Sequence, residues 1–453
     1  MAAATTAGAV ICGAGIAGVA TAYFLAVQQG MSDVVLCDPR PPLTLTSDKS
    51  TECYRNWWPD PSMVSFMGRS IDLLETLSEE SGNAFNLGRR GYLYVTGGAT
   101  DQLVIAAARI SDAGAGSVRV HRGRSDDPSY PTPQPEGWAG HLDGADVFAA
   151  SEPLREQFPY LTNAARAATH VRRAGWFSAQ QLGAWMLDRA REQGLALRRD
   201  RVVAVDVDKD RVTGVRFDNE ARIATDVFIN AAGPMAQRIA AMIAVDLPLY
   251  NEVHLKVAFR DSLGAIQRDA PMLIWTDPQR LNLSDEERAL CIEQGRTDLL
   301  AEMPAGCHCR PEGGVDSQWV LGLWAYSRDV RQPVWPLPTD PLYADTVLRG
   351  LATMVPALAA YLEDPPQCVV DGGYYTRTTD NLPLIGPVGP RGSYVCGALS
   401  GFGIMAAPVV GELIAAYATG AGLPDYAAAL HPDRYGDPAY REQVAEATAT
   451  GQI

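Results

Sequence analysis

The sequence has no dense cysteine framework, no excess of basic residues and no segment suited to cross a membrane as one helix. Its eight cysteines are scattered over 453 residues, which favours reduced thiols and a cytoplasmic protein over a disulfide scaffold. Only 38 basic residues oppose 53 acidic ones, and the formal charge of -15 argues against nucleic acid or anionic lipid as partners. Glycines interrupt the uncharged run 7–32, and no basic residue precedes it, so we predict neither a membrane span nor a secretory leader.

Metal ligands are equally sparse. Cys307 and Cys309 flank His308, but a zinc site needs four ligands and no second cluster lies nearby, so we expect no metal. Apolar residues make up 47% of the chain and charged residues 20%, as in folded globular proteins. The length allows about two to three domains, or one nucleotide-binding fold with an inserted second domain.

The N-terminal segment carries a nucleotide-binding pattern. A short apolar strand over 9–12 runs into Gly13, Gly15 and Gly18, and a helix-compatible segment follows. Such glycines permit a tight turn, a close approach of the backbone to a pyrophosphate and close packing of helix on strand. Asp38 ends the next predicted strand, at the spacing expected for an acid that accepts hydrogen bonds from an adenosine ribose. The pattern predicts a dinucleotide site but does not separate flavin from nicotinamide.

Three further segments decide between the two cofactors. They cover residues 174–234, 378–387 and 397–408, and in order and spacing they resemble the D-amino-acid oxidase and sarcosine oxidase family of flavoenzymes, which includes glycine oxidase. The resemblance implies FAD and an α/β (α+β) fold, in which a Rossmann-like FAD-binding domain is interleaved with a mixed-sheet substrate-binding domain. We expect the FAD-binding domain at 1–90, 146–245 and 365–435, the substrate domain at 91–145 and 246–364, and a C-terminal tail at 436–453.

The resemblance assigns cofactor contacts to three loops and to residues between them. The glycines near 401 leave backbone N–H groups bare before a helix, where they can face the pyrimidine end of a flavin and stabilise negative charge. Family members with covalent flavin carry a cysteine at the position of Gly373, so we expect FAD to be held without a covalent bond. The residues expected to contact the cofactor are Gly13, Gly15, Ile16, Ala17, Gly18, Asp38, Pro39, Arg40, Ser50, Thr51, Val203, Ala232, Gly233, Gly373, Gly401, Phe402, Gly403 and Ile404.

The family's two carboxylate anchors are absent. Tyr375 stands where glycine-oxidase-like members carry an arginine, and Met405 replaces the lysine of sarcosine-oxidase-like members. Arg377, two residues beyond Tyr375 on the same face of an extended segment, is the best remaining candidate to clamp an anion. These departures weaken the case for a simple amino acid as substrate.

Other polar and aromatic residues are candidates of lower rank, each with a purely structural alternative. Lys49 and Arg55 lie in the loop expected to pass over the flavin, with Trp57 as a pocket wall. His254 and Lys256 share one face of a strand predicted over 252–259. We therefore predict catalytic roles for Tyr375, Arg377, Lys49 and Arg55, and substrate contacts for Trp57, His254, Lys256 and Arg377.

The function that the resemblance implies is oxidation of a carbon–nitrogen bond of an amino acid or of a secondary or tertiary amine. A hydride would pass to flavin N5 and leave an imine, with O2 or another compound as electron acceptor. One alternative is a flavin-dependent tailoring oxidase or dehydrogenase acting on a larger biosynthetic substrate. A second is a non-catalytic FAD-binding assembly or interaction protein. We expect a monomer or small homo-oligomer.

Overall fold

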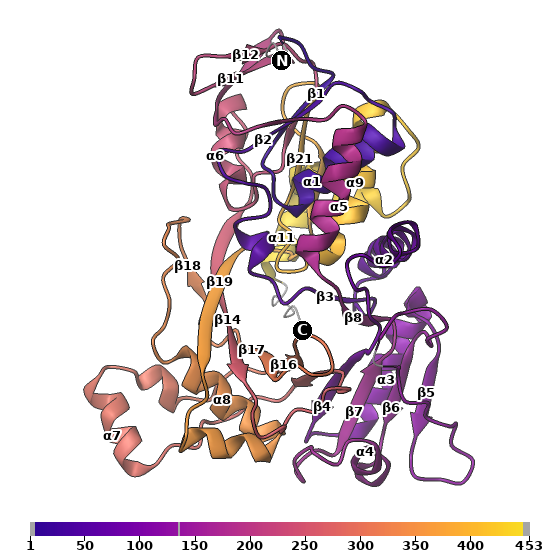
Figure 1. The fold of residues 1–453 in the computed structure, drawn as a ribbon, viewed down its shortest axis with the longest axis vertical. Helices are drawn as coiled ribbons and strands as arrows, with labels where there is room; N and C mark the ends of the chain where they lie inside the picture. Colours follow the sequence, from indigo (N-terminus) through magenta and orange to yellow (C-terminus); the bar gives the residue numbers. More distant parts are fainter. Residues whose placement is uncertain (1–4, 135, 447–453) are drawn as a thin grey trace.

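The computed structural model describes residues 5–134 and 136–446, and these form two sheet-based parts that lie one above the other in Figure 1. The upper part holds β1, β2, β21 and the helices α1, α5 and α9, and the lower part holds the larger sheet with α8. Within the described ranges, no helix combines the length and the apolar character needed to cross a membrane.

The upper part is built on a six-stranded sheet. Its strands are parallel except for the edge strand β20, which runs antiparallel to β21. In spatial order they are β20 (Leu384–Pro387), β21 (Ser393–Gly397), β13 (Phe228–Asn230), β1 (Ala9–Cys12), β2 (Val34–Cys37) and β9 (Ala196–Arg198). The predicted strand–turn–helix at the N-terminus and the strand after it are therefore confirmed.

Alternate side chains of β1 and β2 pack into two different hydrophobic clusters, one on each face of the sheet. Ile11 and Leu36 point into the core beneath the helices, whereas Val10 and Val35 pack against the small antiparallel sheet of β10 (Val202–Asp208), β11 (Arg211–Phe217) and β12 (Arg222–Ile223). A side chain at Gly411 would meet the backbone of Ala20 at 2.7 Å, so α9 lies directly against α1. The helical layer contains α1 (Ile16–Tyr23), α2 (Pro61–Ser81), α5 (Ala179–Glu192) and α9 (Gly403–Thr419).

The lower part is a mixed ten-stranded sheet, as the fold prediction requires. Parallel pairing occurs between β4 and β15 and between β5 and β6, and the other pairs are antiparallel. In order, the strands are β18 (Asp329–Val330), β14 (Tyr250–Arg260), β17 (Trp319–Leu323), β16 (Cys307–Pro311), β15 (Met272–Trp275), β4 (Tyr92–Thr96), β7 (Ala167–Val171), β6 (Ala145–Phe148) and β5 (Val118–His121), with β19 (Cys368–Arg377) paired to β14.

Short helices surround this sheet, and a two-stranded antiparallel sheet lies between it and the upper part. In this small sheet, β3 (Cys53–Arg55) pairs antiparallel with β8 (Ala174–Trp176). The helices are α3 (Thr100–Ile110), α4 (Ser151–Gln157), α7 (Asp285–Glu293) and α8 (Tyr343–Met354), while α6 (Ala236–Ala240) belongs to the upper part.

Two expected domain boundaries do not coincide with the sheets. The segment 146–173 was expected in the FAD-binding domain, yet β6 and β7 belong to the ten-stranded sheet because they pair with each other and with β4. The strand β19 likewise pairs along its whole length with β14, so residues 365–377 go with the lower part. We therefore propose a nucleotide domain of 5–90, 174–245 and 378–446 and a substrate domain of 91–173 and 246–377.

The described part of the C-terminal tail is helical and anchored. After α10 (Ala427–Leu430), α11 (Pro438–Glu446) brings the Tyr440 hydroxyl to Asp380, and Arg434 donates to the same carboxylate from Nε at 2.8 Å. The rest of the predicted tail, 447–453, lies outside the described residues, as do residues 1–4 of the predicted FAD-binding domain and residue 135 of the predicted substrate domain.

Candidate functional site

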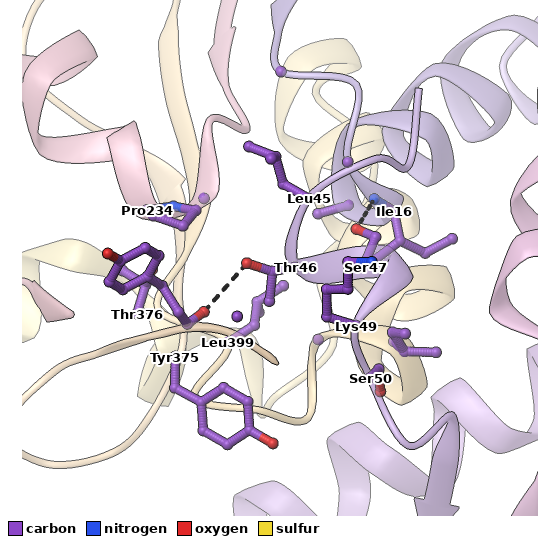
Figure 2. Close-up of a pocket in the computed structure, with 18 of the residues that line it drawn as sticks. Ile16, Leu45, Thr46, Ser47, Lys49, Ser50, Pro234, Tyr375, Thr376 and Leu399 are labelled. Carbon is purple, nitrogen blue, oxygen red and sulfur yellow. Dashed lines mark hydrogen bonds between the residues drawn. The ribbon is translucent and has the colours of Figure 1, made fainter. Parts of the chain in front are cut away.

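A cavity lies between the two sheets and takes its walls from both domains (Figure 2). Its empty volume is about 1160 Å³ with the open mouth included. The nucleotide domain contributes the turn after β1, the loop 40–50, residues 231–234 and the loop before α9, and the substrate domain contributes parts of β14 and β19.

The turn after β1 has the shape that a dinucleotide needs. Gly13 has φ +110°, and a Cβ on Gly18 would lie 1.9 Å from the carbonyl oxygen of Gly13. Asp38 braces the turn, because its carboxylate accepts the amide of Ala14 at 3.0 Å and that of Arg40 at 2.9 Å. The resulting cradle is bare backbone that side chains would fill, so these residues fit a bound pyrophosphate and ribose.

The loop 44–51 closes over this turn. Ser47 Oγ accepts the amide of Ile16, the first residue of α1, at 3.0 Å, and Thr46 donates to the carbonyl of Tyr374 on β19 at 3.4 Å. Figure 2 shows both hydrogen bonds on the cavity wall. Lys49 also lines the cavity, where its Nζ forms ion pairs with Asp48 at 2.7 Å and Asp371 at 3.0 Å. The loop therefore connects the nucleotide turn to the substrate sheet.

The glycine-rich segment before α9 forms the opposite wall. Ala398 and Ser400 have φ of +55° and +46°, an uncommon conformation for residues other than glycine that often marks functional loops. The amide of Ser400 donates to the Thr376 carbonyl at 3.0 Å, so β19 holds this loop in place. The loop leads into the first turn of α9, and Gly401, Gly403 and Ile404 line the cavity there.

The substrate sheet presents a stacked pair of rings and a lysine. His254 and Lys256 alternate along β14, as predicted, and both line the cavity. The His254 ring stacks on Tyr375 of β19 with centroids 3.8 Å apart. Lys256 Nζ donates to the Ser50 carbonyl at 3.1 Å, and among the described residues no carboxylate lies within ion-pair distance of it.

Charge and burial set the protonation states of this wall. Burial lowers the pKa of His254 more than its hydrogen bond to Glu252 raises it, so the imidazole is neutral at neutral pH. Burial also raises the pKa of Glu252, but the hydrogen bond from His254 and the Arg377 guanidinium outweigh that effect and lower it. Burial lowers the pKa of Lys256 as well, with Asp371 acting in the opposite direction. Neutral His254 donates from Nε2 to the carboxylate, which leaves Nδ1 as an acceptor.

The structure brings most of the predicted cofactor contacts together. Gly18, Phe402 and Thr51 do not line the cavity. Gly18 packs against Gly13, and the Phe402 ring packs against Trp58. The Thr51 carbonyl accepts a hydrogen bond from the Arg310 guanidinium. Val203 on β10 is 45% exposed and, like Pro39, is not part of the cavity lining. The predicted cofactor residues that line the cavity are Gly13, Gly15, Ile16, Ala17, Asp38, Arg40, Ser50, Ala232, Gly233, Gly373, Gly401, Gly403 and Ile404.

Of the four residues predicted to be catalytic, Tyr375 and Lys49 line the cavity and two do not. Arg377 Nε forms an ion pair with Glu252 Oε2 at 3.0 Å, because Glu252 lies opposite Tyr375 on the neighbouring strand. The Arg55 guanidinium lies 4.0 Å from the centroid of the Trp58 ring, and Trp57 is buried in the core beside it. Neither Arg55 nor Trp57 belongs to the cavity lining.

Sequence reasoning missed Leu45, Thr46, Ser47 and Leu399, which all line the cavity. Hydroxyl residues are common in loops and carry no pattern of their own, so only the position of the loop over α1 reveals Ser47. Within the described residues, no group of three or more histidine, cysteine or acidic side chains is placed to hold a metal ion.

Comparison with known proteins agrees with this architecture. No curated protein matches the chain. Among solved structures, L-proline dehydrogenase from P. horikoshii is 21% identical with a TM-score of 0.73, over 96% of this chain and 98% of that one. Glycine oxidase from Geobacillus kaustophilus is 17% identical with a TM-score of 0.70, over 94% and 98%. NikD, an unusual amino acid oxidase essential for nikkomycin biosynthesis, is 14% identical with a TM-score of 0.69, over 94% and 97%.

These similarities establish the fold, and a family profile extends the agreement to the sequence. The profile is described as FAD dependent oxidoreductase (DAO), and it matches residues 9–417, from the first strand of the nucleotide sheet to the last turn of α9. The chain therefore belongs to the DAO family of FAD-dependent oxidoreductases, with FAD as its cofactor.

Proposed function

We propose that this enzyme oxidises the carbon–nitrogen bond of an amino acid whose carboxylate is held by Lys256. The observation that carries the proposal is a lysine without a carboxylate partner, among the described residues, on the cavity wall opposite the nucleotide turn. When bound, FAD supplies the acceptor for a hydride from the carbon next to the substrate nitrogen. The names of the proline dehydrogenase and glycine oxidase that share the fold are consistent with such a substrate.

The wall residues favour the reactive form of an amino acid. The sequence contains three lysines, and two of them, Lys49 and Lys256, line the cavity. A cation beside the bound substrate favours a carboxylate and lowers the pKa of an ammonium group, and burial acts on the ammonium in the same direction. The anionic amino acid with a neutral amine, which is the form able to release hydride, is thereby stabilised.

His254 and Tyr375 would position the substrate against this lysine. The neutral imidazole has one acceptor nitrogen to offer an amine N–H, and Glu252 fixes the ring by accepting from Nε2 at 3.1 Å. The stacked rings form a flat surface that excludes water from one side of the reacting carbon. No acid–base side chain is required beyond one that accepts a hydrogen bond from the amine.

We propose that FAD is held without a covalent bond. A Cβ at Gly373, the position of the family's covalent cysteine, would lie 3.2 Å from Thr46 Cα. Cys396 lines the cavity, but burial raises the pKa of its thiol to about 12, and a thiol is a far poorer nucleophile than a thiolate. Acid precipitation of the yellow protein should leave all flavin in the supernatant, and a yellow pellet would contradict this.

The decisive experiment is anaerobic mixing of the FAD-loaded enzyme with matched pairs of compounds, such as L-phenylalanine with 2-phenylethylamine, L-proline with pyrrolidine, and N-methylglycine with dimethylamine. We expect the carboxylated member of one or more pairs to bleach the visible flavin band and its decarboxylated partner to do so far more weakly. Readmission of air then tests whether O2 is the acceptor. A flavin that no amine bleaches would refute amine oxidation and leave the non-catalytic alternative.

Lys256→Met tests the anchor directly. We expect the dissociation constant of the carboxylated substrate to rise about 10- to 100-fold, as for loss of a charge-assisted hydrogen bond. Lys209→Met is the matched control, because Lys209 lies in the turn between β10 and β11, far from the cavity lining. Equal affinities for the two variants would remove Lys256 from this role.

A further inference from the structure

A second cavity adjoins the first on the substrate sheet. His254 and Leu255 line both cavities. On the neighbouring segment, Leu323 lines the first cavity and the next residue, Trp324, lines the second. Its empty volume, with the open mouth included, is about 620 Å³. The two cavities therefore meet at His254 and Leu255.

A gap in the sheet lies at this junction. The pairing of β14 with β17 stops at Val257 opposite Gly322, and its pairing with β18 begins at Val253 opposite Asp329. Three residues, 254–256, thus face six, 323–328, and the longer segment bows away from β14. The Tyr343 hydroxyl of α8 fills the broken ladder, because it donates to the Leu255 carbonyl and accepts the Trp324 amide at 3.1 Å. The gap is therefore satisfied and stable as it stands.

Three aromatic side chains in the walls of the second cavity, Trp324, Tyr326 and Tyr343, are held in place by hydrogen bonds. Trp324 donates from its indole nitrogen to the Pro304 carbonyl at 2.9 Å, and Tyr326 donates to Asp340 at 2.9 Å. The rings of Tyr326 and Tyr343 stack with centroids 5.7 Å apart. A cavity whose aromatic walls are locked in this way loses little entropy when a flat group enters it.

The charged residues that line the cavity are already paired. Arg331 pairs with Asp329 through Nε at 2.9 Å, and Asp340 accepts both terminal nitrogens of Arg296, at 3.0 and 2.9 Å. A charged ligand group would have to compete with these ion pairs, whereas an uncharged aromatic or apolar group would not. The cavity is therefore suited to a neutral, bulky group.

We infer that the second cavity receives the side chain of the substrate, and that this side chain is aromatic or comparably bulky and apolar. The inference rests on the proposed function, since it places the amino acid's carboxylate at Lys256 and extends the side chain past His254, one of the two residues that line both cavities. It distinguishes this enzyme from one built for glycine or another small amine, and it favours the larger substrate of the tailoring alternative.

The test measures binding of two probe acids to the FAD-loaded protein, through the perturbation of its visible flavin band. The probes are 3-phenylpropionate, which reaches the second cavity, and propionate, which does not. We expect Ala325→Trp and Ser327→Trp, which introduce bulk at the cavity lining, to weaken 3-phenylpropionate about tenfold or more. Propionate should bind as in the wild type.

Gln332→Trp is the matched control, because it adds the same side chain to an exposed position in the loop after β18, outside the cavity lining. Circular dichroism and thermal unfolding confirm that each variant is folded. Unchanged 3-phenylpropionate binding in both filled variants, or no preference for 3-phenylpropionate over propionate in the wild type, would overturn the inference. Failure of the proposed function is separately visible, as a flavin that no amine bleaches whatever the probes do.

Discussion

The rings of His254 and Tyr375 stack with centroids 3.8 Å apart and planes inclined by only 13°. In the register of β14 and β19, His254 lies opposite Gly373, and Tyr375 is its diagonal neighbour on the same face. The strand register therefore brings the two rings together, whereas a Cβ at Gly373 would approach Thr46 most closely, at 3.2 Å. The pair therefore forms one flat surface on the cavity wall, although its members are far apart in the sequence.

Replacing Tyr375 with leucine should loosen that surface. Aromatic pairs contribute about 0.5–1.5 kcal/mol beyond the area they bury, so Tyr375→Leu should lower thermal stability slightly and raise the substrate's KM by releasing the His254 ring. Tyr375→Phe keeps the stack and should resemble the wild type in both measurements. If leucine is tolerated and phenylalanine is not, the hydroxyl and not the stack is important.

Gly18→Ala should abolish the dinucleotide cradle. The new Cβ would lie 1.9 Å from the Gly13 carbonyl oxygen, and neither backbone can move without separating α1 from β1. We expect purified Gly18→Ala to contain little FAD and to lose at least about 1–3 kcal/mol of stability, as in other overpacked sites. Gly422→Ala is the control, since nothing lies within 4 Å of its Cβ position. A full complement of FAD in Gly18→Ala, measured by the visible band, would contradict the geometry.

Stability at low pH should depend on Asp380. Burial raises the pKa of Asp380, but the Arg434 guanidinium and several hydrogen bonds outweigh it and lower the pKa from 3.8 to about 2. Because the folded value is below the unfolded one, the stabilisation is complete well above pH 4 and is lost as the pH falls toward 2. The difference corresponds to about 2 kcal/mol, of which about 1 kcal/mol is lost by pH 3.

Asp380→Asn removes this dependence and leaves Arg434 buried without its carboxylate, at a cost of about 3–5 kcal/mol at neutral pH. Urea unfolding at pH 6 and pH 3 should show a smaller pH effect in the variant than in the wild type. Asp218→Asn serves as the control, because that carboxylate is half exposed and lies 3.9 Å from its arginine partner. An identical pH effect in all three proteins would exclude the assigned role of Asp380.

The nucleotide turn was predictable because its requirements are local. Gly13 and Gly18 are demanded by backbone geometry within a few residues, and Asp38 follows at a fixed distance along the next strand. The period of two along β14 likewise placed His254 and Lys256 correctly on one face. Such patterns are written in neighbouring residues, so a single sequence displays them.

The partners of the charged side chains were not predictable in this way. Arg377 lies on the same strand face as Tyr375, as expected, but Glu252 on the neighbouring strand pairs with its guanidinium. Trp58 lies under the Arg55 guanidinium. Register between strands distant in sequence decides the contact of Arg377 with Glu252, and the same kind of non-local pairing carries β6 and β7 into the larger sheet. The contact of Arg55 with Trp58 is local, but no residue pattern in the sequence displays it.

Trp335 connects the substrate domain to Arg40 of the nucleotide domain. It belongs to the loop 331–342, which Tyr374 fastens to β19 by accepting the Val334 amide at 2.9 Å and donating to the Val334 carbonyl at 3.0 Å. From there the Trp335 ring lies 5.3 Å from the guanidinium of Arg40, a residue that lines the first cavity. Since the Arg40 amide also donates to Asp38, the ring restrains the ribose-binding end of the site.

Trp335→Ala should therefore weaken FAD binding without disturbing the nucleotide turn. A cation–π contact at an exposed site contributes about 0.5–1 kcal/mol, which corresponds to a two- to fivefold rise in the dissociation constant of FAD. Titration of the flavin-free protein by fluorescence measures this directly. Trp335→Phe, which retains a ring over Arg40, should recover part of the affinity, whereas a polar residue such as glutamine should not. Equal FAD affinity in the wild type and in Trp335→Ala would show that the loop merely rests against the nucleotide domain.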